Sequence, residues 1–495
     1  MTSKDDQRMY RFDLLDRTGV FLGFGIAQLA VLAVGGLAST LAITASAPLP
    51  IAAAPLMLAA TVAMTRVGGA RLIDWLPILY HWIAGRRNRQ WFAPLHLLAP
   101  TDESHSSPTL PPFLAGLELV EAPNDWGRLA GSGVVHDSTL GSMSAVVRVR
   151  SQGFALAPRD EQVRLLAGWG DVLSGFATER GTVAWLTWSD FASPTGMRDH
   201  ETWLATLPGQ PTAAAASYQA LLDGTGAVAA GHDVLVSITV VADRLTRGPA
   251  RVDARARLMS ALGKATDSLL RGLRTASLLA DDPLTVGEIA TVLRTRLDPR
   301  AMHRAGGASL AARLGLTDPS NAGPLAVESR WGQLRTDGAC HRTYVISEWP
   351  RLTQHPDWME PMLGFGSGCR SITVVFEPVA PSASRRRIDR DSIKLDTDAV
   401  ARAEKGRRVD ASHRRLQAAV VEREAELLAG YAENAYTGLV TVTADSEERL
   451  QAACDETQQV AREHGLELRA LDGRQDLAFA AALPLGLGLS RVGVL

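Results

Sequence analysis

The 495-residue chain lacks the features that mark disulfide-bonded folds and general nucleic-acid binders. Its three cysteines lie far apart and include no C-x-x-C pair, so neither a disulfide framework nor a zinc site is predicted, and a reducing compartment is favoured. Its 51 basic residues almost equal its 53 acidic residues. This balance gives no electrostatic footprint of a general nucleic-acid binder. The cysteines are Cys340, Cys369 and Cys454.

Motifs that bind phosphate or metal are also missing from the sequence. No G-x-x-x-x-G-K-[ST] loop occurs, and the nearest run, GFGSGCRS at residues 364–371, lacks the lysine that reaches a phosphate. The histidines form no H-E-x-x-H motif, and His341 beside Cys340 is a sequence neighbour rather than an opposed base. The aspartates of residues 389–398 lack the glycine and glutamate of a calcium loop. We therefore predict no catalytic, cofactor-binding or metal-binding residue, and no enzyme activity.

Charge is absent from a long stretch near the amino terminus, where no Asp, Glu, Lys or Arg lies between residues 18 and 65. One helix of this length would exceed a hydrocarbon core of ~30 Å, whereas two spans of ~20 residues joined at SAPLP (46–50) fit it. A signal peptide or a buried core hairpin explains the stretch less well, because its start has mixed charge and its apolar run is long. The sequence thus predicts a transmembrane hairpin with helices at about residues 19–45 and 49–67.

Arginines flank this hairpin on both sides and its turn is uncharged, so the positive-inside rule predicts a multi-pass protein of the cell membrane with both termini cytoplasmic. Residues 69–90 follow with Trp75, Tyr80 and Trp82 and a cluster of arginines. This pattern is typical of an interfacial helix on anionic lipid, and an ordinary charged helix end is the alternative. The first unit is expected to span residues 1–95, with inner-membrane lipid as a partner.

The next part of the chain predicts a linker and an α+β domain. Residues 96–125 are rich in Pro and Ser, which is typical of a linker. Residues 126–378 alternate strand and helix patterns, which predicts a cytoplasmic α+β domain with helices on one face of mostly antiparallel sheets and ferredoxin-like β-α-β units. Within it, residues 142–150 alternate as a half-buried strand. Thr285 with Glu288 predicts a capping box for a helix over residues 284–297.

The carboxy-terminal part begins with residues 379–417, a charged helical segment in which Arg and Lys outnumber acids. A solvated arm is the plain interpretation and a docking surface the alternative; because no aromatics are interleaved, no sequence-specific nucleic-acid binding is predicted. Residues 418–495 predict a β-α-β unit with strands at 438–443 and 466–471. Asp445 and Glu448 are expected to cap its helix, and Gly465 to end it.

The tail DGRQDLAFAAALPLG (472–486) resembles the segment just before the nucleotide-binding loop in conjugative, VirB-type ATPases of type IV secretion systems. In those proteins a Gln, a Phe and a Leu-Pro close the N-terminal domain. The front of the chain resembles the small two-helix membrane subunit that accompanies such ATPases, and the whole layout resembles an actinobacterial family of PrgI-like integral membrane proteins. No P-loop follows the tail, so ATP hydrolysis is not carried over. The matching positions are Gln475, Phe479, Leu483 and Pro484.

This resemblance implies a membrane-anchored, non-catalytic subunit of a type IV secretion or conjugation-like translocation machine, equivalent to the membrane subunit fused to the ATPase's N-terminal domain without its motor. Its partners would be a separately encoded P-loop ATPase, which it docks, and other subunits of the secretion channel; a homo-oligomer is compatible with this layout. Two alternatives stay open. One is a type VII (ESX) secretion core component of the E type, and the other is a membrane-bound enzyme whose site has no recognised motif.

Overall fold

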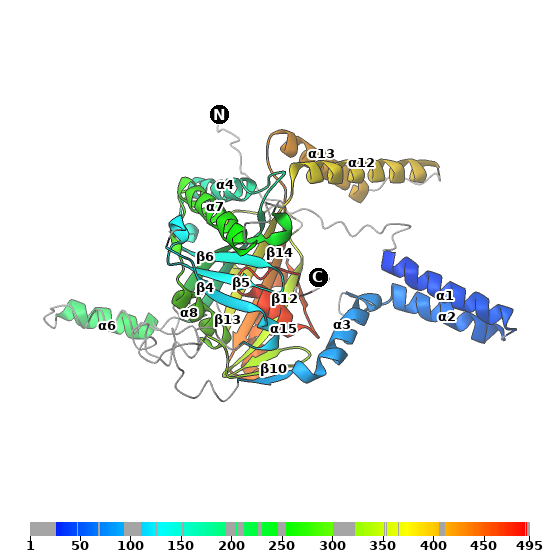
Figure 1. Ribbon diagram of the computed structural model, residues 1–495, viewed down its shortest axis with the longest axis horizontal. Helices are drawn as coiled ribbons and strands as arrows, with labels where there is room; N and C mark the ends of the chain where they lie inside the picture. The colour runs from blue at the N-terminus through cyan, green and yellow to red at the C-terminus, as the bar shows by residue number, and fades with distance from the viewer. Residues whose placement is uncertain are drawn as a thin grey trace.

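One antiparallel sheet of 13 strands forms the body of the protein (Figure 1). The computed structural model describes residues 26–46, 48–67, 70–93, 110–124, 126–150, 153–194, 204, 212–225, 230–245, 254–299, 322–350, 352, 354–364, 366–404, 411–490 and 492. Two short strands pair with the sheet outside its main path, β9 (Leu279–Pro283) with β6 and β15 (Glu467–Ala470) with β12. The main path runs β3 (Gln90–Phe92), β10 (Ala326–Ser329), β11 (Leu334–Thr336), β12 (Ala339–Glu348), β14 (Asn434–Ala444), β13 (Cys369–Pro378), β7 (Val183–Pro194), β8 (Ala230–Val241), β6 (Ser142–Arg150), β5 (Gly133–Asp137) and β4 (Leu117–Glu121).

Helices cover both faces of this sheet. On one face the apolar side of α7, with leucines at three-to-four-residue spacing, packs on Met143, Ala145 and Val147 of β6. A strand does span residues 142–150 as predicted, but it is buried on both faces over most of its length and is not half-buried. The other side of β6, with Val146, faces α8 and the carboxy-terminal tail. The first face carries α4 (Arg159–Ser174), α7 (Ala254–Thr275), α11 (Glu360–Leu363) and α14 (Glu447–Glu463), and the second carries α8 (Val286–Leu297) and α15 (Gln475–Ala482).

The two halves of the sheet repeat the same arrangement. The series β4, β5, β6, α4, β7, β8, α7, β9, α8 and the series β10, β11, β12, α11, β13, β14, α14, β15, α15 follow the same chain order and strand neighbours. At the centre β7 pairs with β13, and Ser189 lies opposite Thr373. The halves are therefore related by an approximate twofold axis through this pair.

Individual hydrogen bonds repeat as well. Between β6 and β8 the hydroxyls of Ser144 and Thr239 are hydrogen-bonded at 2.8 Å. At the corresponding place between β12 and β14, Nδ1 of His341 and the hydroxyl of Thr443 are hydrogen-bonded at 2.9 Å. The bond from the Leu284 amide to the Val146 carbonyl has a counterpart in the bond from the Leu471 amide to the Thr343 carbonyl. These matches show that the repeat extends to the register of the strands.

The predicted fold class, a transmembrane hairpin followed by α+β domains with ferredoxin-like units, is wrong. The strands join one continuous 13-stranded sheet, and helices lie on both faces instead of one. The local pattern of each strand could not reveal this, because β7 and β13 pair across nearly two hundred residues of chain. The alternation of apolar and polar residues in a strand indicates which of its faces is buried, but it does not indicate which distant strand pairs with it.

The membrane prediction is corrected too. Among the described residues, no helix combines the length and the apolar character needed to span a bilayer. The charge-free stretch forms α1 (Ile26–Thr44) and α2 (Leu49–Met64), and the 16 residues of α2 reach only ~24 Å against a hydrocarbon core of ~30 Å. The predicted transmembrane hairpin, the multi-pass cell-membrane location and the orientation derived from them are therefore wrong. Residues 1–25 lie outside the described part of the chain.

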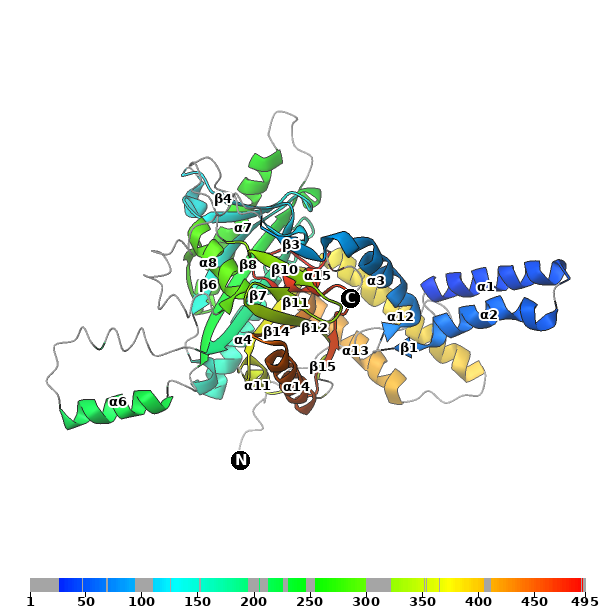
Figure 2. The same cartoon turned by 90° about the horizontal axis from the view of Figure 1, so that it is seen from below.

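Instead, α1 and α2 pack on each other as an arm that extends from the body (Figure 2). The Gln28 side chain donates to the Ala63 carbonyl, and the Ser39 hydroxyl accepts from the Leu56 amide at 3.1 Å. Gly35 allows the close approach, because a Cβ there would lie 2.4 Å from the Cβ of Ala59. β1 (Arg66–Val67), β2 (Ala70–Arg71) and α3 (Leu72–Ala84) connect this arm to β3.

Two further segments extend from the sheet (Figures 1 and 2). α6 (Ala213–Thr225) lies between β7 and β8, and the helical pair α12 (Pro381–Glu404) and α13 (Ala411–Leu428) lies at the corresponding place between β13 and β14. Of the expected linker of residues 96–125, residues 96–109 and 125 are outside the described part, and residues 110–124 include β4. The short 3-10 helices are η1 (Gly85–Asn88), η3 (Pro112–Leu114), η4 (Gly127–Leu129), η5 (Phe154–Leu156) and η6 (Ala242–Arg244).

Candidate functional site

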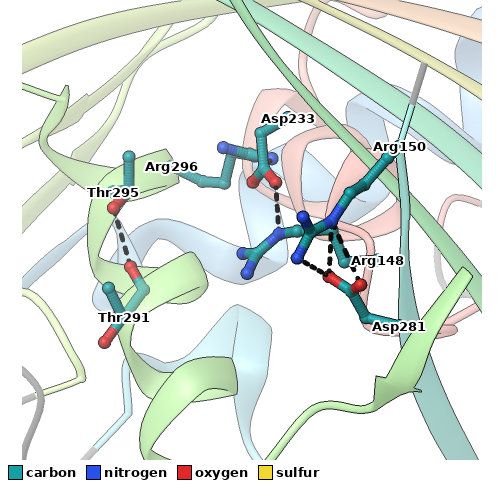
Figure 3. Close-up of polar contacts among 7 residues, drawn as sticks. All are labelled: Arg148, Arg150, Asp233, Asp281, Thr291, Thr295 and Arg296. Atoms are coloured by element: carbon teal, nitrogen blue, oxygen red, sulfur yellow. Dashed lines mark hydrogen bonds and ion pairs between the residues drawn. The ribbon is translucent and has the colours of Figure 1, made fainter. Parts of the chain in front are cut away.

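A cluster of charged side chains lies in the first half of the sheet, between β6, β8, β9 and α8 (Figure 3). Asp233, on β8, accepts from Arg148 of β6 at 2.9 Å with one oxygen and from Arg296 of α8 at 2.9 Å with the other. Arg150 of β6 pairs with Asp281 of β9 at 3.1 Å. The cluster thus joins three strands and one helix through side chains.

Burial makes Arg296 the central member of this charge cluster. Its side chain is 4% exposed, and its guanidinium carbon lies 4.0 Å from the ring centre of Phe191. Burial lowers the pKa of the Arg296 guanidinium, and the neighbouring Asp233 opposes that shift. Burial alone would raise the pKa of Asp233, but Arg296 and Arg148 outweigh it, so the pKa of this carboxyl lies below its ordinary value.

The members of the charge cluster differ in their hydrogen bonding and in their exposure to solvent. Thr295 donates its hydroxyl to the Thr291 carbonyl one turn earlier at 2.8 Å, so this side chain stays within the helix. The Arg148 and Asp233 side chains remain about a third exposed, at 35% and 29%. The Nε of Arg296 is buried and has no hydrogen-bond partner in the structure. The Arg150 side chain is 68% exposed, so solvent reaches the cluster at Arg148, Arg150 and Asp233 but not at Arg296.

The repeat shows that the fold does not require these charges. Counted along the matched strands, Arg148 corresponds to Val345 and Asp233 to Thr437. The equivalent place in the second half is an apolar cluster, so the same architecture forms there without buried ions. That cluster contains Val345, Leu439, Leu471, Ala478, Ala481, Ala482 and Val492. The charge cluster is therefore a feature added to the first half.

The chemistry of the charge cluster is that of ion pairing. Its members offer guanidinium and carboxylate groups, and the aliphatic hydroxyls of α8 are bonded to backbone carbonyls rather than to a base. On the opposite face, His232 lies 3.0 Å from a carboxylate oxygen of Asp190, and this hydrogen bond raises the pKa of His232. Within the described residues no group of three or more His, Cys, Asp or Glu side chains could hold a metal ion.

His341 and Cys340, which are neighbours in the sequence, have structural roles. His341 is fully buried, with Nε2 2.8 Å from the Thr336 hydroxyl and Nδ1 2.9 Å from the Thr443 hydroxyl. Burial lowers its pKa to about 3. Cys340 belongs to the apolar cluster around α14, and burial raises the pKa of its thiol. The two neighbours thus do not form a nucleophile–base pair.

The loop at residues 364–371 and the aspartates of residues 389–398 also serve structure. Arg370 donates to the carbonyls of Met362 and Gly364 at 3.2 and 3.0 Å, which fixes the turn between α11 and β13. The aspartates lie along α12, and Asp391 pairs with Arg423 of α13 at 3.6 Å. No phosphate or calcium loop is present at either of these two described segments.

The tail residues that carry the family resemblance come together against the sheet. Gln475 is fully buried; its carbonyl oxygen accepts from the Thr343 amide at 2.7 Å and its amide donates to the Thr343 carbonyl at 3.2 Å. Phe479 is 3% exposed and its ring centre lies 4.5 Å from that of His341. Leu483 and Pro484 are buried in the turn that follows α15.

The rest of the tail continues across both halves of the sheet. The Ala482 carbonyl accepts from the Thr373 hydroxyl at 2.7 Å, and the Gly486 carbonyl accepts from Thr239 at 3.2 Å and from the Trp185 indole at 3.0 Å. Gly486 has φ +69 and no room for a Cβ. The tail therefore closes a sheet face that is lined with hydroxyl groups.

No protein-family model matches the chain, and no curated protein is similar enough to it in sequence to count as a match. The likeness to conjugative ATPases thus depends on the order of elements and the residues of the tail. The charge cluster was not found from the sequence, because its members come from four elements. The sequence pattern that could have indicated the cluster is the charged residue near the end of an otherwise apolar strand, as at Arg148 and Asp233.

Proposed function

We propose that the protein is a non-catalytic scaffold subunit of a type IV secretion or conjugation-like translocation machine, and that it docks a separately encoded P-loop ATPase. The observation that carries this proposal is the tail. Gln475 and Phe479 are buried against β12, and Leu483 and Pro484 close the same face. The resemblance implies that a Gln, a Phe and a Leu-Pro close the N-terminal domain of such ATPases, and the burial of the matching residues here supports the proposal.

The surface proposed for docking is the helical pair α12–α13. Its base is held by Glu433, which bonds Arg387 at 2.8 Å and Arg423 at 3.5 Å, and by bonds from Ser382 to Glu179. The pair also exposes apolar side chains seven positions apart on each helix, which places the two residues of each helix on one side of that helix. They are Ile393 and Val400 on α12 and Val421 and Leu428 on α13.

Exposed apolar side chains at this spacing suit a helix of a partner protein, which would add a third helix to the pair. Charged residues of both signs flank these side chains in the sequence, so ion pairs at the rim of the contact can set the orientation of the partner. A scaffold of this kind needs only modest contact strength if other subunits hold it nearby, because attachment raises the local concentration of the partner.

Affinity capture of the tagged full chain from its own host, with identification of the proteins recovered, tests the proposal. We expect a P-loop ATPase to be enriched, and Ile393→Asp or Val421→Asp to reduce its recovery at least about fivefold, since a charge would have to be buried in the contact. Leu221→Asp is the matched control, because Leu221 is 62% exposed on α6, which lies on the opposite side of the body from α12–α13 (Figures 1 and 2).

Three outcomes contradict the proposal. The first is recovery of no P-loop ATPase with the unaltered chain, and the second is equal recovery with the α12–α13 variants and the Leu221→Asp control. The third is steady ATP hydrolysis by the purified chain alone, which a non-catalytic scaffold does not perform.

A further inference from the structure

A hollow of about 640 Å³ lies where α3 ends and β3 joins β10. Guanidinium and aromatic side chains line it, and we call it the arginine–tryptophan pocket. Its volume falls in the range of ~300–1,000 Å³ typical of small-molecule sites. Neither α3 nor β3 has a counterpart beside β4 among the described residues, so the pocket is an addition to the repeated body. The residues that matter are Trp82, Arg86, Arg89, Phe92, Arg330 and Trp331.

The positive charge of this pocket is only partly balanced: Glu328 also lines the pocket and pairs with Arg330, and Asp476 interacts electrostatically with Arg89. The Arg86 side chain is exposed, and no hydrogen bond or ion pair of it is present in the described part of the chain. Arg89 donates to the Trp82 carbonyl, but its Nε is buried without a partner and it forms no ion pair with a described carboxylate. Arg330, by contrast, is paired with Glu328 and Glu447, each at 3.1 Å. Arg86 and Arg89 are thus available to an anion.

Aromatic rings give the pocket a second kind of binding surface. Trp331 stacks on Trp75 with ring centres 5.9 Å apart and meets Trp82 edge-on at 5.3 Å, so its position is fixed. The guanidinium of Arg89 lies over Trp82 at 3.4 Å, which holds this cation in place. Phe92 is 71% exposed at the rim, and its ring is free to stack on a planar group.

We propose that the arginine–tryptophan pocket binds a nucleotide unit, with the phosphate on Arg86 and Arg89 and the base on Phe92. Cations and an exposed ring side by side are the two elements by which proteins hold single-stranded nucleic acids, and a free nucleotide presents the same groups. A bare inorganic anion would use the arginines but not Phe92. The proposal is independent of ATPase docking, and either one can fail without the other.

Binding of the full chain to a fluorescently labelled oligothymidylate, measured by anisotropy at several salt concentrations, tests this inference. We expect Arg86→Ala to weaken binding. It should also reduce, by about one, the slope of the logarithm of the binding constant against the logarithm of the salt concentration. Phe92→Ala should weaken binding by about tenfold, because one stacked base is lost. Both side chains are exposed, so the fold should be retained, which thermal melting verifies.

Matched controls remove the same groups elsewhere. Arg271→Ala removes an exposed arginine of α7, and Tyr431→Ala removes a ring that is 62% exposed after α13; both should bind as the unaltered chain does. Competition identifies the source of the nucleotide unit. Displacement by ATP as readily as by unlabelled oligothymidylate indicates a free nucleotide, and displacement by the oligomer alone indicates a single strand.

Three results overturn the inference: no binding of oligothymidylate or ATP by the unaltered chain, binding that is the same in the two pocket variants as in the controls, or displacement of the oligomer by inorganic phosphate as effectively as by ATP. The last result would show a general anion site in which the ring of Phe92 has no part.

Discussion

At the scale of single residues, His341 shows how context decides the chemistry of a side chain. In the sequence it stands beside Cys340, and only the fold reveals that its two nitrogens bond the hydroxyls of Thr336 and Thr443. Because the imidazole is buried in a site that accommodates its neutral form, its pKa falls to about 3. This residue therefore links the stability of the sheet to pH.

We expect stability to fall as pH decreases from about 6.5 toward 3. Above that window His341 is neutral in both states, so its contribution is fully present. Within it the unfolded chain takes up a proton that the folded chain excludes, which favours unfolding by about 2 kcal/mol at pH 5. Denaturant unfolding at pH 7 and pH 5 should show a smaller loss for His341→Gln than for the unaltered chain. Equal losses in the two proteins would refute this assignment.

The charge cluster marks the limit of residue-level prediction. Alternation along β6 puts Arg148 and Arg150 on the same side of the strand, and the structure has Arg148 on the side that faces α8. Nothing local indicated that Arg148 and Arg296 would share the two oxygens of Asp233, because that contact depends on how α8 returns across β8. Alternation gives the face of a residue, whereas its partner comes from the tertiary arrangement.

At the scale of elements, helix ends were the features best predicted from sequence. The capping box of α8 is confirmed: the Glu288 amide donates to the Thr285 hydroxyl at 3.3 Å, and the Glu288 carboxylate accepts from the Thr285 amide at 2.8 Å. For α14 the cap is Ser446 rather than the predicted Asp445, whose carboxylate instead pairs with Arg449. The side chains of Asp445 and Ser446 can both accept a hydrogen bond, so the sequence pattern fixes the position of this N-cap only to within one residue.

Removing the α8 cap should lower stability by a measurable amount. Thr285→Ala leaves the Glu288 amide without its side-chain acceptor, and we expect the free energy of unfolding to fall by about 1 kcal/mol. Thr285→Ser is the matched control, since it keeps the hydroxyl. Denaturant unfolding compares the two variants, and an Ala variant as stable as the Ser variant would show that this cap does not contribute.

At the scale of the whole molecule, the sequence predicted most of the elements and missed how they join. Periodicity identified strands such as β6 and helices such as α7 because each has one apolar face. It could not show that β7 pairs with β13, since Ser189 and Thr373 are far apart in the chain. It also read the charge-free stretch as two membrane spans, where the structure has two shorter helices joined by polar contacts.

The tail should be essential to the whole fold. It covers both halves of the sheet through Gln475, Ala482 and Gly486, and its removal would expose buried hydroxyls and apolar side chains together. We expect a chain that ends at residue 474 to lose cooperative thermal unfolding and to become sensitive to protease. Replacing residues 213–221 of α6, whose side chains are exposed, by a flexible linker is the control and should leave melting unchanged. Cooperative melting of the shortened chain would contradict this role.

The pairing of β7 with β13 has a mechanical consequence. Force applied across the sheet between its outer strands β3 and β4 passes through this ladder, because β13 and β7 join the two halves in the middle of the sheet. The ladder pairs seven residues of each strand, from Arg370 with Ala192 to Phe376 with Leu186, so several backbone hydrogen bonds share the load. The two halves are therefore built to move as one stiff lever, without a hinge at the centre.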